Sequence, residues 1–128
     1  MFIINIRIES KKSSLTKKEI WNLINYTYSV SVEEGLNPPL NTMILVLDSE
    51  AYNRYPKEDG IKGEHFFCRL HPPMLIIRGD ISADSIAFNI IKLARVLAYY
   101  NTYNILDLEK AEEWARKHFM KALSFMVQ

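Results

Sequence analysis

The sequence predicts an α+β fold in which about four strands form a small mixed or antiparallel sheet against about three helices. Two observations lead to this prediction. Apolar residues recur every three or four positions in three long segments, which is the period of an amphipathic helix. Between these segments lie short runs that are apolar throughout or at alternate positions, as in strands. The predicted order is β-α-β-β-β-α-α, and its partial segregation of strands from helices is typical of the α+β class.

A strand, a helix and a second strand are expected in the first third of the chain. Residues 2–8 alternate between two faces with the period of a strand. Thr16 precedes Glu19 by three residues, a capping-box pattern that predicts a helix from there to about Glu34. The run 42–47 is apolar throughout and predicts a buried strand. The inner face of the helix is expected to carry Ile20, Trp21, Leu23, Ile24, Thr27, Tyr28 and Val32.

The middle of the chain is expected to hold a long loop and two strands. The polar segment 48–63 reads as a loop, of a length that is uncommon in a compact domain and often functional. Strands are predicted at 64–70 and 74–78, on either side of a Pro-Pro pair.

Two helices are expected to close the chain. One spans about 83–101 after a cap at Ser82 or Asp84, and the other spans about 108–126 after Asp107. The core stripe of the first is Ile86, Ile90, Leu93 and Leu97. The inner side of the second is Leu108, Ala111, Trp114, Ala115, His118, Phe119, Ala122 and Phe125.

The composition predicts one compact domain over residues 1–128. Apolar residues make up 48% and charged residues 24% of the chain, so a buried core is available. The net charge of +1 argues against a whole protein built to bind polyanions. The single cysteine, Cys68, excludes an intramolecular disulfide and favours a reducing compartment. Neither a signal-like N-terminal segment nor a membrane-spanning apolar run occurs, so we expect a cytoplasmic protein without membrane contact.

His65, Cys68 and His71 have a spacing that could suggest a zinc site. Side chains of a strand alternate between faces, so the two histidines would share one face and the cysteine would lie on the other. Three ligands cannot converge from one straight strand, and we expect no metal or other cofactor. The sequence also lacks a glycine-rich nucleotide loop and a GxSxG motif.

Lys11, Lys12, Lys17 and Lys18 cluster around the predicted start of the first helix. A basic cluster can contact phosphates, which makes a nucleic-acid-associated protein an alternative function. A solvated helix start is the other interpretation of the same lysines. An oligomeric structural protein is a further alternative, with exposed aromatic residues of the last helix forming a symmetric contact.

Two stretches of the second half resemble the zincin metallopeptidases. Residues 93–100, LARVLAYY, are similar to the part of their active-site helix that usually reads HELAHVLAYY. Residues 107–115, DLEKAEEWA, are similar to the DExxAExxA pattern of the next helix. The resemblance covers roughly residues 42–118 and implies a zincin-like fold. In such enzymes the first pattern supplies two histidine ligands and a glutamate base, and the second supplies the third zinc ligand.

All four catalytic positions implied by this resemblance are replaced. They fall on Ile91, Lys92, Arg95 and Leu108. Aliphatic side chains and protonated arginine offer no lone pair to a metal, and lysine cannot activate a metal-bound water as glutamate does. The resemblance therefore implies a metal-free pseudoenzyme without catalytic activity.

A protein-interaction or binding module is the function that we expect, with another protein or a second copy of the chain as its partner. The residual cleft is expected between the central helix and the strand at 74–78, with the segment 48–63 at its edge. Arg78, Lys92 and Arg95 would line this cleft with positive charge.

Overall fold

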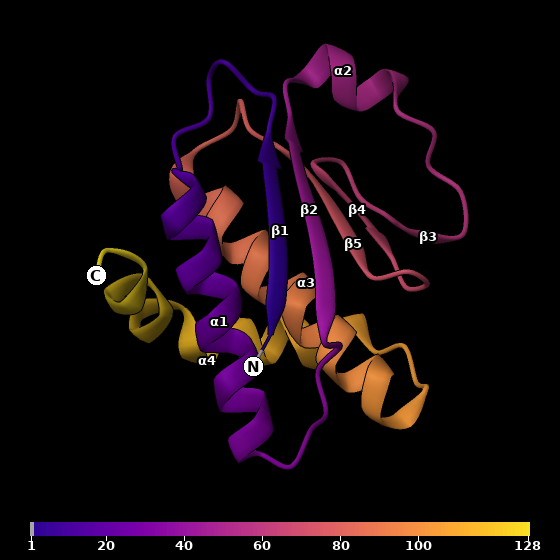
Figure 1. Ribbon diagram of the computed structural model, residues 1–128, viewed down its shortest axis with the longest axis vertical. Helices are drawn as coiled ribbons and strands as arrows, with labels where there is room; N and C mark the ends of the chain where they lie inside the picture. Colours follow the sequence, from indigo (N-terminus) through magenta and orange to yellow (C-terminus); the bar gives the residue numbers. More distant parts are fainter. Residues whose placement is uncertain (1) are drawn as a thin grey trace.

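The computed structural model of the chain describes residues 2–128. Five strands and four helices follow one another as β1 (Ile3–Ile8), α1 (Lys17–Glu33), β2 (Asn41–Leu47), α2 (Ser49–Arg54), β3 (Gly60–Lys62), β4 (Phe66–Arg69), β5 (Met74–Arg78), α3 (Ala83–Tyr103) and α4 (Leu108–Met126) (Figure 1). Within residues 2–128, no helix combines the length and the apolarity needed to cross a membrane.

The strands form one mixed sheet in the order β1-β2-β5-β4-β3. β1, β2 and β5 are parallel, with Ile6 beside Ile44 and Ile44 beside Leu75. β4 and β3 continue the sheet in antiparallel pairings on the far side of β5. The α+β class and the mixed sheet agree with the prediction, and β1 and β3 are the two edges of the sheet.

The helices cover the two faces of the sheet unequally. α1 and α3 pack on one face, and α4 packs on α1 and α3 behind them (Figure 1). Alternate residues of the central strands, among them Ile44 and Leu75, point into the main core on this side. The intervening residues, among them Leu45 and Ile76, form a smaller cluster on the opposite face, to which α2 contributes Tyr52. In the described part of the chain no helix packs on the opposite face near β1, and Met43 there is half exposed.

The segment 48–63 corrects the predicted number of elements. The sequence predicts one long loop here, but the structure has α2 and β3, which gives four helices and five strands instead of about three and four. α2 has six residues and β3 has three, and both are too short for an apolar period to show. Burial of Tyr52 holds α2 against the sheet, and the ladder to β4 holds β3. Both short elements therefore depend on tertiary contacts.

Local capping signals place the helix starts. The Glu19 amide donates to Thr16 Oγ1 at 3.2 Å and the Thr16 amide donates to Glu19 Oε1 at 2.8 Å, which are the two halves of the predicted capping box. Ser82 is the residue that caps α3, since its Oγ accepts from the Ser85 amide at 3.2 Å. α3 runs past its predicted end and stops at Asn104, whose φ of 58° is left-handed.

Burial confirms the predicted core stripe of the central helix and corrects those of its neighbours. The four stripe residues of α3 are all buried: Ile86, Ile90, Leu93 and Leu97. In α1, however, Trp21 is 40% exposed and Val32 is 50% exposed. In α4, Leu108 and Phe125 are also exposed. α1 lies beside the edge strand and α4 lies outside the first helix layer, so each of these helices has a narrower covered stripe than its apolar residues suggest.

Candidate functional site

The free edge of β1 is the starting point of the candidate site. The amide of Ile3 donates to the Leu40 carbonyl at 2.7 Å, and the amide of Glu9 donates to the Val46 carbonyl at 2.9 Å, so the odd-numbered residues bond toward β2. Backbone groups of a strand alternate in direction, so the N–H and C=O groups of the even-numbered residues point away from β2. No strand pairs with β1 on that side within residues 2–128. The edge therefore presents a row of unpaired donors and acceptors.

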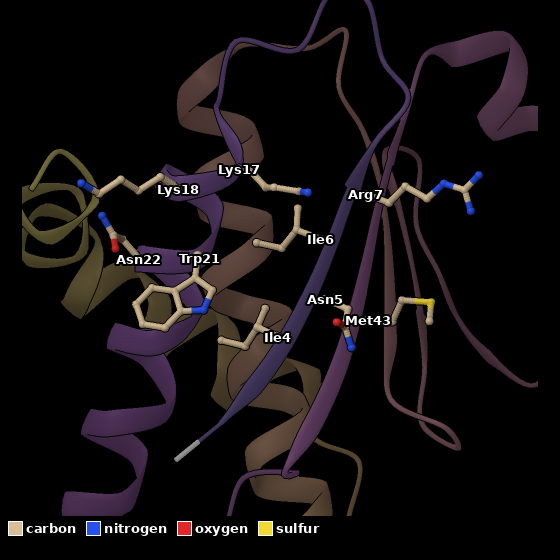
Figure 2. A pocket seen from close by; sticks show the side chains of 9 residues that line it. All are labelled: Ile4, Asn5, Ile6, Arg7, Lys17, Lys18, Trp21, Asn22 and Met43. Atoms are coloured by element: carbon tan, nitrogen blue, oxygen red, sulfur yellow. The ribbon is translucent and has the colours of Figure 1, made fainter.

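A groove of about 720 Å³ runs along this edge, between β1 and α1. Figure 2 shows that Ile4 and Ile6 point from β1 toward α1, where Trp21 lies. Asn5 and Arg7 point to the other side of the strand. The groove is lined by Ile4, Asn5, Ile6, Arg7, Lys17, Lys18, Trp21, Asn22 and Met43. It thus follows the strand edge and includes both faces of β1.

The centre of the groove is apolar. Ile4 and Ile6 are only partly buried although they face the helical layer. The indole of Trp21, 40% exposed, lies on the α1 wall beside them. Partly exposed apolar and aromatic side chains therefore lie together beside the unpaired strand.

Positive charge lies at one end of the groove. Lys17 and Lys18 occupy the first turn of α1, and no ion pair forms at either of them among the described residues. Arg7 lies near the C-terminal end of β1, and its Nε forms an ion pair with Glu9 Oε2 at 2.7 Å. Trp21 follows Lys17 by four positions and Lys18 by three, so the three side chains share one side of the helix. This end of the groove therefore has two exposed ammonium groups without a carboxylate partner.

The four predicted phosphate-contacting lysines divide into two pairs. Lys17 and Lys18 line the groove, whereas Lys11 and Lys12 are exposed in the turn between β1 and α1 and do not line it. The turn is held by backbone donation: the Lys11 amide donates to Asp48 Oδ2 at 3.2 Å. A hydrogen bond from Ser10 lowers the pKa of Asp48, which keeps this carboxylate charged.

Arg78, the first residue of the predicted cleft, is fully engaged with its neighbours. It donates from Nη2 to Ser49 Oγ at 2.9 Å and from Nε to Asp80 Oδ1 at 3.1 Å. Its Nη1 lies 3.1 Å from His65 Nδ1. Hydrogen bonds from Ser49 and Arg78 hold the pKa of Asp80 well below its ordinary value. This network joins β5 to the start of α2.

Lys92 and Arg95, the other two residues of the predicted cleft, lie in different surroundings. Lys92 Nζ lies 4.6 Å from the ring centre of Phe66, in a hollow that is also lined by His65, and burial lowers its pKa. Arg95 points elsewhere, and its Nη1 donates to Glu34 Oε1 at 2.5 Å. The structure thus places Lys92 near the histidine that contacts Arg78, and places Arg95 between α1 and α4.

The remaining two positions of the zincin resemblance have aliphatic side chains, which lie in different surroundings. Ile91 is fully buried in the main core, and Leu108, at the start of α4, is 37% exposed. Among residues 2–128, no three His, Cys, Asp or Glu side chains lie close enough to hold a metal ion.

His65, Cys68 and His71 have three different surroundings, and only Cys68 of the three lies within β4. Cys68 is buried in the main core, and burial raises the pKa of its thiol to about 12, so it stays protonated at neutral pH. His65 contacts Arg78, and His71 Nε2 lies 3.2 Å from the Tyr100 hydroxyl.

Comparisons with protein-family models, with curated proteins and with solved structures found no significant match. The sequence alone misses the candidate site because the apolar pattern assigns Trp21 to the inner face of the helix. The overlooked signal is its spacing to Lys17 and Lys18, which places Trp21 on a solvated side.

Proposed function

We propose that this chain is a protein-interaction module that binds an extended polypeptide segment as an additional strand beside β1. The observation that supports this most is the combination of an unpaired edge with the groove around Trp21. An extended segment would satisfy the outward N–H and C=O groups of Ile4 and Ile6, and its side chains would fill the groove. Recognition would have two components, main-chain pairing and apolar contact, and neither needs a catalytic group.

The two edge strands of the sheet are not equally suited to pair with an added strand. β3, the opposite edge, has only three residues and includes Gly60 and Lys62. Short edge strands with a charged residue are a common protection against strand addition. β1 is twice as long and lies beside a groove, so it is the edge suited to a partner.

The scaffold that we propose for this module is zincin-like, metal-free and without catalytic activity. Its support is the sequence resemblance of residues 93–100 and 107–115, with Ile91 and Leu108 at two positions where such enzymes hold zinc. Cys68, the one thiol of the chain, is buried and protonated, so it offers no nucleophile in place of the lost site.

Binding to single-stranded nucleic acid is the second candidate, because Trp21 lies one helical turn from Lys17 and Lys18. An aromatic side chain beside cations is a common stacking platform for bases. The apolar side chains of Ile4 and Ile6 and the outward backbone groups of β1 favour the polypeptide, since neither feature serves a phosphate backbone.

Proline substitution on β1 tests the proposed function. Ile6→Pro removes an N–H that points outward and leaves the β1–β2 hydrogen bonds intact. Ile6→Ala is the matched control, because it removes the same apolar side chain and keeps the N–H. The probes are blocked peptides of about eight residues, long enough to cover an average strand. Each peptide alternates valine with threonine in its middle and carries, at both ends, a pair of residues of one type, which is threonine, glutamate or lysine, so that one residue of each end pair lies on the helical side.

Titration of these peptides into the isotope-labelled protein gives the readout. We expect at least one peptide to shift the amide signals of β1, and Ile6→Pro to bind it about three- to tenfold more weakly than Ile6→Ala does. If no peptide shifts these signals, or if the proline and alanine variants bind equally, the proposed function is wrong.

A further inference from the structure

We infer that the segment bound at β1 is acidic as well as apolar, with carboxylates at the end that lies against the first turn of α1. This inference rests on the proposed function and adds the chemical class of the partner. Three properties of the groove support it: the two faces that it offers, the position of its charge, and the poor fit of a second copy of the same chain.

The two faces of β1 predict alternation in the bound segment. A strand added beside β1 would place every second side chain on the helical side, against Ile4, Ile6 and Trp21. The intervening side chains would lie on the open side, where Asn5 and Arg7 point. Apolar residues suit the helical-side positions beside Ile4 and Ile6, and polar residues suit the open side. At the end of the groove beside Lys17 and Lys18, the helical-side position suits a carboxylate.

The charge of the groove is concentrated near the N-terminus of α1. Lys17 and Lys18 are exposed there without an ion-pair partner among the described residues. Glu19, the nearest carboxylate on the helix, is held by the Thr16 amide in the capping box. A bound carboxylate would meet two ammonium groups and the positive end of the helix dipole, whereas a bound lysine would meet like charge.

A second copy of the chain fits this groove poorly. Pairing two β1 strands about Ile6 would bring Lys17 and Lys18 of both copies to one groove, on the side where α1 lies. Four ammonium groups would then share a surface where Glu19 is already bonded in the capping box and Glu9 is paired with Arg7. Like-charge contact at an interface opposes association, so we expect a different, acidic chain as the partner.

The three peptides described above separate this inference from the proposed function. We expect the glutamate peptide to bind about five- to tenfold more tightly than the threonine peptide, and the lysine peptide to bind most weakly. Added salt should reduce this difference, because the lysines are exposed. Equal affinities for all three peptides would overturn the inference and leave the proposed function standing. Absence of binding by all three would overturn both.

Charge reversal identifies the lysines that select the partner. The double variant Lys17→Glu, Lys18→Glu should reverse the preference, so that the lysine peptide binds more tightly than the glutamate peptide. Negative side chains in the first helical turn are favourable with the helix dipole, so this variant is expected to fold. The matched control is Lys11→Glu, Lys12→Glu, which makes the same charge change outside the groove and should keep the original preference.

An oligothymidylate titration tests the nucleic-acid alternative. Phosphate binding through all four lysines would be weakened similarly by both double variants and would fall steeply with salt. Tight oligothymidylate binding with that pattern, together with no preference among the peptides, would overturn the inference. We expect weak oligothymidylate binding, and a peptide preference that only the Lys17, Lys18 variant reverses.

Discussion

The guanidinium of Arg95 lies 2.5 Å from the carboxylate of Glu34, and this contact joins the middle of α3 to the end of α1. The same carboxylate oxygen accepts from the indole of Trp114 at 2.9 Å, and the guanidinium carbon of Arg95 lies 4.7 Å from the ring centre of that residue. One acceptor therefore connects three helices. Arg95 is mostly buried in this network, where an unpaired charge is costly.

Substitution of Arg95 by methionine should destabilise the fold. The change leaves Glu34 and the Trp114 indole with one partner fewer, and we expect a loss of about 1–3 kcal/mol in the free energy of unfolding. Arg54→Met is the matched control, because its ion pair with Glu50 is fully at the surface and is worth less than about 0.5 kcal/mol. Urea denaturation of both variants measures the difference. Equal losses in the free energy of unfolding would show that the Glu34 network stabilises the fold no more than an exposed ion pair does.

Hydrogen exchange should alternate along β1 in the free protein. The amides of Asn5 and Arg7 face β2 and should be protected, whereas those of Ile4 and Ile6 face the open edge and should exchange quickly. Residue-resolved exchange followed by NMR measures this pattern. Uniform protection along the strand would show that something already covers the edge, and it would contradict the open edge described above.

His118 should make the stability depend on pH between about 7 and 5. Its ring stacks on Trp114 with centres 4.0 Å apart, and its Nδ1 lies 3.0 Å from the Tyr26 hydroxyl. Burial and the nearby Arg95 lower its pKa below 6.5, although Glu34 opposes this. A histidine whose pKa is lowered on folding takes up its proton more readily when unfolded, so stability is lost as the pH falls through the unfolded value.

Denaturation at pH 7.5 and pH 5 tests this sign. The wild type should be less stable at the lower pH, and His118→Gln should lose part of that difference because glutamine does not titrate. If His118→Gln lost as much stability between pH 7.5 and pH 5 as the wild type does, the pH dependence would come from other groups.

Metal analysis of the purified chain should find no stoichiometric zinc. Ile91 and Leu108 have no metal-binding atom, and Arg95 is bonded to Glu34. Elemental analysis by mass spectrometry after dialysis measures the content directly. One zinc per chain would contradict the metal-free scaffold that we propose.

The parts of the fold that the sequence predicts well are those with a long apolar period or a local cap. The stripe from Ile86 to Leu97 repeats over several turns and identifies α3, and the Thr16–Glu19 pair marks the start of α1. α2 and β3 are too short to carry a period, so they appear only when Tyr52 and β4 supply their contacts.

The candidate site was not predictable in the same way, because its main property is the position of β1 at the edge of the sheet. Residues 2–8 have the alternation of a strand whether that strand is central or at an edge. Strand order follows from how β5 pairs with β2, which involves residues more than 30 positions apart. Trp21 illustrates the result: its spacing to Ile24 and Tyr28 fits an inner face, and only the edge position of β1 leaves it partly uncovered.

The unpaired edge of β1 also makes this chain sensitive to dosage. An open strand can pair with other extended segments that reach it, and encounters with them rise with the concentration of the chain. Encounters with a partner rise with the product of the two concentrations. Under the function that we propose, a cell that makes the chain in excess of its partner would leave this edge open to other extended segments, so balanced synthesis of the two would keep the edge in its proper pairing.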